Sequence, residues 1–181
     1  MVTTYVALLR GINLAGRRKV AMPDLREALA EAGFEDVATY IQSGNIVLNS
    51  GKPATRLRTE LEKVIEDRFE FAVPVILRSR KQLDSVIAAN PFPEPSDPRL
   101  LHVVFLEKAA SAAAVKKLAA SATGSDEVKS VGKELYLNTP DGFGRSKLAA
   151  ALAKDPSGIT GTARNWRTVL KLAEMAAGSG S

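Results

Sequence analysis

The sequence contains no cysteine and only one histidine, His102. The absence of cysteine excludes disulfides, thiol nucleophiles, iron–sulfur ligation and cysteine-based zinc sites. A serine–histidine triad would need His102, which lies inside the apolar run 100–106. A histidine in such a run is more often a strand residue with satisfied hydrogen bonds than a base. A carboxylate-only magnesium site stays open, but no acidic cluster has ligand spacing, so neither a metal nor a cofactor is expected.

Long hydrophobic runs are also missing. No apolar stretch approaches the ~20 residues that span a bilayer. Residues 2–9 are too short for a secretion signal and have no basic leader. We therefore expect a cytoplasmic protein that does not bind membranes. With 181 residues, 45% hydrophobic and 25% charged, the chain suits one large globular domain or two small ones.

The first half of the chain follows the order β-α-β-β-α-β. Apolar periodicity predicts strands at 4–10, 36–42, 45–49 and 73–78, and helices at about 23–32 and 54–69. Glycine in Ser43-Gly44 supplies the tight turn between the second and third strands. This order is that of the ferredoxin-like, or split βαβ, plait.

The second half begins to repeat this order. A short helix at 80–89 and a proline-rich connector at 90–98 lead to a strand at 100–107, a helix at 111–121, strands at 127–131 and 134–138, and helices at 144–153 and 162–176. We predict an α+β fold of two ferredoxin-like (split βαβ) modules packed together, the second ending in extra helices. The modules are expected at 1–79 and 80–177, with a flexible tail at 178–181.

The net charge of +5 is concentrated near the C-terminus. Residues 142–172 carry one acidic side chain, Asp155, against Arg145, Lys147, Lys154, Arg164, Arg167 and Lys171. Arg145 and Lys147 fall in the opening turn of the helix expected at 144–153, and Arg164 falls in that of the last helix. Helix N-termini favour anions over cations, so basic side chains at two of them predict a bound anion. The alternative is an amphipathic helix with a solvated basic face.

A second candidate is the loop after the first strand, where Arg10 and Asn13 precede the basic run 17–19. Strand ends of α/β sheets often hold ligands, although a plain surface loop is equally compatible. The hairpin 42–45 is a third candidate, for which local turn structure is the stronger explanation. The candidate anion-binding residues are Arg10, Asn13, Arg145, Lys147, Arg164, Asn165, Arg167 and Lys171.

Three functions compete. The first, which we favour, is a module that binds nucleic acid or another polyanion through the C-terminal basic surface, chiefly by phosphate contacts because aromatic residues make up only 6% of the chain. The second is an enzyme or sensor for a small phosphorylated or carboxylated metabolite, which needs Arg10, Asn13, Arg145 and Arg164 to converge. The third is a structural or protein-interaction module. No catalytic constellation is evident, and the oligomeric state stays open.

Four ordered blocks resemble one bacterial family. They are residues 5–13 (YVALLRGIN), 39–47 (TYIQSGNIV), 144–148 (GRSKL) and 163–166 (ARNW), and the family is the one catalogued as domain of unknown function 1697. The resemblance implies a bacterial protein with two ferredoxin-like halves, and it supplies no activity, cofactor or catalytic residue. Where the family commonly has two glycines, this chain has Ala15-Gly16, a departure expected to change little.

Overall fold

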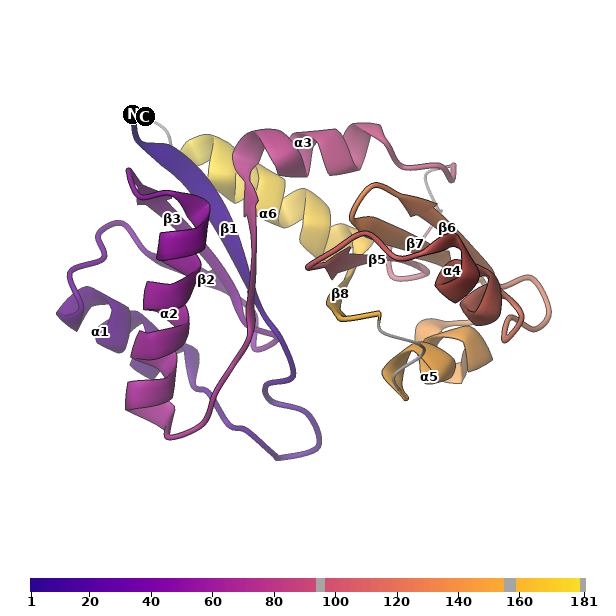
Figure 1. Ribbon diagram of the computed structural model, residues 1–181, viewed down its shortest axis with the longest axis horizontal. Helices are drawn as coiled ribbons and strands as arrows, with labels where there is room; N and C mark the ends of the chain where they lie inside the picture. The colour runs from indigo at the N-terminus through magenta and orange to yellow at the C-terminus, as the bar shows by residue number, and fades with distance from the viewer. Residues whose placement is uncertain (94–96, 155–158, 180–181) are drawn as a thin grey trace. The chain divides into compact units, whose positions relative to one another are not determined.

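A computed structural model describes residues 1–93, 97–154 and 159–179. Over these residues the chain forms a mixed α/β structure with two four-stranded antiparallel sheets and six α-helices (Figure 1). No helix in the described ranges combines the length and apolarity that a membrane crossing needs. Of the proline-rich connector, residues 94–96 lie outside the described ranges.

The chain divides into two compact units. The first unit comprises Met1–Asp84 together with Lys171–Ser181, and the second comprises Ser85–Leu170. The sequence placed the boundary after residue 79 and assigned the C-terminal helix to the second module. In the structure, the C-terminal half of that helix belongs to the first unit.

The first unit contains one sheet in the order β2-β3-β1-β4. Its strands are β1 (Thr3–Leu9), β2 (Ala38–Tyr40), β3 (Asn45–Ser50) and β4 (Val75–Ser79). Helices α1 (Met22–Glu31) and α2 (Ala54–Phe69) lie on one face of this sheet (Figure 1). Leu25 and Leu29 of α1 and Leu57, Leu61 and Ile65 of α2 repeat at helical spacing and pack on that face.

Strand β1 is the centre of the first unit, as its continuous apolar run predicts. Successive residues of a strand point to opposite faces, and Val6, Ala7 and Leu8 are all fully buried. Antiparallel pairing with β3 and β4 fixes β1 on both sides. Because β1 is held so tightly, the loop that leaves its C-terminal end starts from a rigid position.

The second unit repeats the strand order, as β6-β7-β5-β8. Its elements are β5 (Leu101–Leu106), α4 (Ala112–Ala119), β6 (Glu127–Val131), β7 (Glu134–Asn138), the 3-10 helix η1 (Phe143–Arg145), α5 (Lys147–Ala153) and β8 (Gly161–Asn165). Leu118 of α4 and Leu148 of α5 pack on the sheet face formed by Val104, Leu135 and Leu137. Tyr136 points to the opposite face, where its hydroxyl donates to the carbonyl of Val86 at 2.7 Å.

Strand β8 overturns the prediction that the last helix begins near residue 162. Residues 161–165 pair antiparallel with β5, placing Arg164 opposite Val103, and the helix α6 (Trp166–Gly178) follows directly. Asn165 caps this helix, since its Oδ1 accepts from the Thr168 amide at 2.9 Å. The second half therefore completes the β-α-β-β-α-β order and is followed by a single helix.

Helices follow the fourth strand in both units. Helix α3 (Arg80–Ala88) follows β4 as α6 follows β8. Helix α6 extends to Gly178, and Ser179 still donates from its amide and hydroxyl to the carbonyl of Met175. Of the expected tail at 178–181, residues 178–179 are therefore tied to α6. Residues 180–181 lie outside the described ranges.

Candidate functional site

The loop that connects β1 to α1 is held by the side chain of Asn13. Its Nδ2 donates to the carbonyl of Val20 at 2.9 Å and to that of Gln42 at 2.7 Å, while its Oδ1 accepts from the Val20 amide at 2.9 Å. Both amide hydrogens are thus used within the protein. Asn13 was predicted to contact an anion. The structure gives it a structural role: it closes the loop and ties it to the β2–β3 turn.

Five residues of the same loop adopt the left-handed backbone conformation, with positive φ. Gly11 and Gly16 adopt φ values of 71° and 76°, and three non-glycine residues, Asn13, Ala15 and Arg18, adopt 53°, 48° and 48°. The amide of Arg17 donates to the carbonyl of Leu14 at 2.9 Å and closes a small turn. Residues other than glycine and asparagine rarely adopt this left-handed conformation, because their Cβ atom crowds the backbone. Ala15 therefore adopts a backbone conformation that glycine would adopt with less strain.

The β2–β3 turn is equally constrained. Gly44 has φ of 81°, and a Cβ atom there would lie 2.6 Å from Cδ1 of Ile12 and 2.7 Å from Cβ of Leu9. Asn45 is fully buried and donates through Nδ2 to the carbonyl of Tyr40 at 2.8 Å. The local explanation of this turn as a hairpin is thus supported by direct contacts, and no side chain fits at Gly44.

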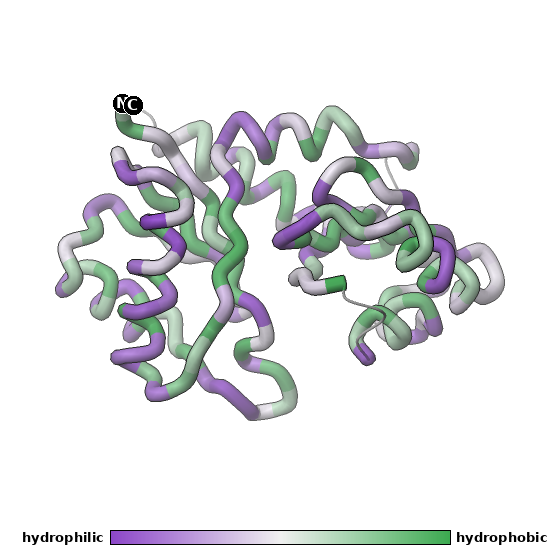
Figure 2. Tube along the Cα trace, in the orientation of Figure 1, coloured by the Kyte–Doolittle hydropathy of each residue, from purple (hydrophilic) through white to green (hydrophobic). Residues whose placement is uncertain are grey.

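These two segments form one surface, which we call the loop surface and define as residues 10–19 and 41–44. The Asn13–Gln42 hydrogen bond joins them, and the amide of Leu9 donates to the carbonyl of Gly44 at 2.8 Å. The β1–α1 part projects beyond the end of β1 (Figure 1). In this part of the chain, hydrophilic residues directly follow hydrophobic ones along the backbone (Figure 2).

The loop surface is basic and has no acidic residue. Arg17, Arg18 and Lys19 are exposed, and no carboxylate in the described part of the first unit forms an ion pair with them. Arg18 extends back toward Gly11, where an added Cβ would lie 3.8 Å from its Nη1. No acidic residue occurs in 1–23 or in 37–59. The three exposed cations therefore have no acidic residue close to them in the sequence and no ion pair with the described part of the first unit.

The loop surface also exposes two large apolar side chains, which were not among the predicted site residues. Leu14 is 65% exposed and Ile41 is 47% exposed. Ile41 has φ of 49°, which is unfavourable for a β-branched residue. Leu14 follows Asn13 and Ile41 precedes Gln42, so the two apolar residues flank the hydrogen bond that joins the loops. Exposure depends on tertiary structure, and no local pattern signals it.

The predicted anion site at the start of α5 already has an acidic neighbour. Ser146 caps α5 by accepting from the Ala149 amide at 3.0 Å, and its hydroxyl donates to Oδ2 of Asp126 at 2.7 Å. Arg145 lies in η1 and Lys147 begins α5, and both side chains are exposed. Asp126, which is 20 residues away in the sequence, supplies the negative charge that the helix start lacks locally.

The remaining predicted residues do not form a basic face on one helix. Arg164 is 5% exposed in β8, where its Nη1 donates to Thr162 Oγ1 at 2.7 Å and to the Ala163 carbonyl at 2.8 Å. Burial lowers the pKa of this guanidinium to about 10. Lys171 pairs with Glu174 at 2.8 Å. Arg167 is exposed on α6, and Asn165 is the helix cap. The prediction that Arg164 opens a helix beside Arg167 is wrong.

A second buried arginine occupies the matching place in the first unit. Arg78 of β4 is 7% exposed, and its Nη1 donates to the carbonyl of Leu77 at 2.9 Å, as Arg164 does to the carbonyl of Ala163. Both arginines lie opposite a valine of the central strand, Val6 or Val103. The sequence signal for this match is arginine followed by a helix-capping residue at the end of the fourth strand.

His102 of β5 packs against an aromatic side chain. Its ring stacks on Phe143, with 3.9 Å between centroids, and burial lowers its pKa to about 4. Within the described residues, its Nδ1 is buried without a hydrogen-bond partner. The expectation of a satisfied strand histidine is therefore half right: His102 lies in β5, but Nδ1 is unsatisfied. Over the same residues, no group of three potential ligands is arranged to hold a metal ion.

The comparisons with known proteins agree with this architecture. A solved structure, that of conserved bacterial protein SP0830 from Streptococcus pneumoniae, matches with a TM-score of 0.78 and 24% identity, covering 97% of this chain and 99% of the other. This likeness supports the fold alone. No curated protein is similar enough to count as a match. The family model described as "Protein of unknown function (DUF1697)" matches residues 2–136. The chain belongs to this family of proteins of unknown function.

Proposed function

We propose that the protein is a binding protein whose loop surface docks an anionic macromolecule. The observation that carries this proposal is the group of exposed cations Arg17, Arg18 and Lys19, which have no carboxylate partner in the described part of the first unit. Unpaired, exposed cations on one loop attract anions from solution and accelerate their encounter. Salt weakens such an interaction because it screens the charges.

The way the loop is held supports binding. A flexible basic loop would lose conformational entropy when it ordered around a ligand. Here the three hydrogen bonds of Asn13 and the turn closed by Arg17 and Leu14 fix the backbone beforehand. The backbone at Ala15 and Arg18 is also strained, and strained residues cluster at functional sites. The loop that carries the cations is therefore ordered before a ligand binds, so binding costs less conformational entropy.

We also propose that each unit is a ferredoxin-like module. The strand orders β2-β3-β1-β4 and β6-β7-β5-β8, with β-α-β-β-α-β along the chain, support this assignment. The plait hosts many unrelated functions, so it does not identify the ligand. The proposed function therefore depends on the loop surface and not on the plait.

The small-metabolite alternative has less support. It required Asn13 and Arg164 to be available to a ligand. Both amide hydrogens of Asn13 are donated to backbone carbonyls, and Arg164 is buried in β8. Three exposed cations on one loop suit a macromolecule better than a small anion, which is usually bound in a concave site.

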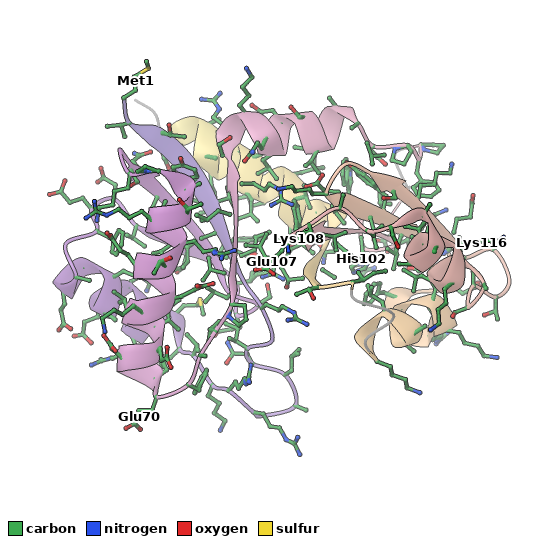
Figure 3. The ribbon with its side chains drawn as sticks, in the orientation of Figure 1. Met1, Glu70, His102, Glu107, Lys108 and Lys116 are labelled. Atoms are coloured by element: carbon green, nitrogen blue, oxygen red, sulfur yellow. The ribbon has the colours of Figure 1, made fainter. Side chains whose placement is uncertain are left out.

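The test is fluorescence anisotropy with labelled single-stranded RNA, duplex DNA and poly-glutamate. The triple variant R17A/R18A/K19A removes three cations from the loop surface. The matched control K108A/K116A/K117A removes three exposed cations from the second unit; Lys108 and Lys116 are labelled in Figure 3. We expect the loop variant to weaken binding of at least one polyanion about tenfold or more and to flatten its salt dependence, with little change in the control. Equal affinity of both variants and the unmodified protein would refute the proposal.

A further inference from the structure

The two exposed apolar side chains of the loop surface indicate what kind of macromolecule binds there. Among the described residues, Leu14 and Ile41 are the most exposed large apolar side chains after Met1 and Val2 at the start of the chain. Leu14 is the sequence neighbour of Asn13 and Ile41 that of Gln42, and the Asn13–Gln42 hydrogen bond joins the two segments that carry them. A polyanion that made only charge contacts would leave both of them in water.

Ile41 is also held in an unfavourable conformation. Its φ of 49° is one that β-branched residues rarely adopt. Asparagine or glycine would fit this turn position better on backbone grounds. Strained residues of this kind persist where the surroundings impose them, and they cluster at ligand-contacting sites. The strain and the exposure at Ile41 together suggest a contact outside the chain.

We infer that the occupant of the loop surface is an acidic segment of another protein, with carboxylates facing Arg17, Arg18 and Lys19 and apolar side chains packing on Leu14 and Ile41. This inference rests on the proposed function and specifies its partner. Protein interfaces commonly combine an apolar centre with a charged rim that steers association. The loop surface offers both features within two short segments.

Nucleic acid fits the same surface less well. Sequence-tolerant binding of single strands depends on aromatic side chains that stack on bases. Residues 10–19 and 41–44 contain no aromatic residue. Aliphatic side chains can wedge into duplex steps, but proteins that use them also read the minor groove. Duplex DNA and RNA are therefore included in the test as competing occupants.

The test compares three labelled probes by fluorescence anisotropy. The first is a short peptide in which Asp and Glu alternate with Leu and Phe, and the second replaces its Leu and Phe with Ser. The third is a single-stranded RNA, with a duplex DNA in parallel. The apolar variant Leu14→Ser/Ile41→Asn keeps every charge of the loop surface. Asn tolerates positive φ, so the turn should fold in this variant.

We expect the apolar variant to weaken binding of the acidic–apolar peptide about tenfold or more, since two aliphatic contacts are lost. Its binding to the acidic–serine peptide should change less than about twofold. The control Val2→Ser/Val131→Ser removes exposed apolar side chains elsewhere and should leave all affinities unchanged. Circular dichroism and melting of each variant check that the fold is intact.

The outcomes separate this inference from the proposed function. If the apolar variant binds the acidic–apolar peptide as tightly as the unmodified protein does, the inference is wrong while the proposed function stands. If RNA or duplex DNA binds more tightly than either peptide and depends on Arg17, Arg18 and Lys19, the partner is nucleic acid and the inference is overturned. If no probe binds, or if R17A/R18A/K19A binds every probe normally, both proposals fail.

Discussion

Replacing Ala15 by glycine should stabilise the first unit. Ala15 is exposed and has φ of 48°, a conformation in which the Cβ atom of an L-residue crowds the backbone. Glycine removes this crowding and loses no buried contact. The gain is partly offset because glycine has more conformational freedom in the unfolded chain.

The expected net gain is about 1 kcal/mol. For a chain of this length, a gain of this size raises Tm by about 2–4 °C. Because the chain has two units, native-state hydrogen exchange is the sharper assay. The amides of Val6 and Leu8 in β1 report the opening of the first unit, and their exchange should slow about fivefold.

The same substitution in a helix is the matched control. Ala30 is exposed near the end of α1, and Ala30→Gly should cost about 1 kcal/mol because glycine disfavours helix. Opposite signs for Ala15→Gly and Ala30→Gly are therefore predicted within one unit. A loss of stability in Ala15→Gly would refute the assignment of strain to this loop.

Further predictions concern the turn, the loop and the histidine. Gly44→Ala should destabilise the first unit by about 2 kcal/mol or more in urea unfolding, because its Cβ would clash with Leu9 and Ile12; an unchanged midpoint would contradict this. Asn13→Ala removes three hydrogen bonds, about 2–3 kcal/mol in sum, and should accelerate tryptic cleavage within the loop surface; unchanged cleavage would show that Asn13 does not hold it. Because the pKa of His102 falls from 6.5 to about 4 on folding, the unfolded chain binds the proton more readily. Stability should therefore fall by up to about 3 kcal/mol as pH drops from 6.5 to 4, and this loss should be smaller in His102→Phe.

Elements with strong local signals could be predicted from the sequence. Helix α2 and strands β6 and β7 have the predicted bounds. The apolar residues of α2 repeat at helical spacing, and Gly132 has φ of 60° in the turn between the two strands. Here local propensity and tertiary structure favour the same conformation.

Strand β8 could not be predicted in this way. Its five residues precede α6 without a turn, and the basic and apolar spacing of the helix can be extended back across Arg164. What makes these residues a strand is their pairing with β5, about sixty positions earlier in the chain. Pairing over such distances overrides local propensity.

The candidate site was predicted only in part. The basic run 17–19 and Asn13 could be recognised because their residue types are visible in the sequence. The role of Asn13 could not, because its partner Gln42 is 29 residues away. The exposure of Leu14 and Ile41 and the positive φ of Ala15 depend on how the two loops close on each other.

The most direct test of a docking loop surface is a map of the amides that a ligand perturbs. Isotope-labelled protein is titrated with the acidic–apolar peptide, and amide chemical shifts are followed by NMR. The account predicts saturable shifts concentrated in residues 10–19 and 41–44. Shifts confined to η1 and α5, around Arg145 and Lys147, or no saturable shifts at all, would contradict it.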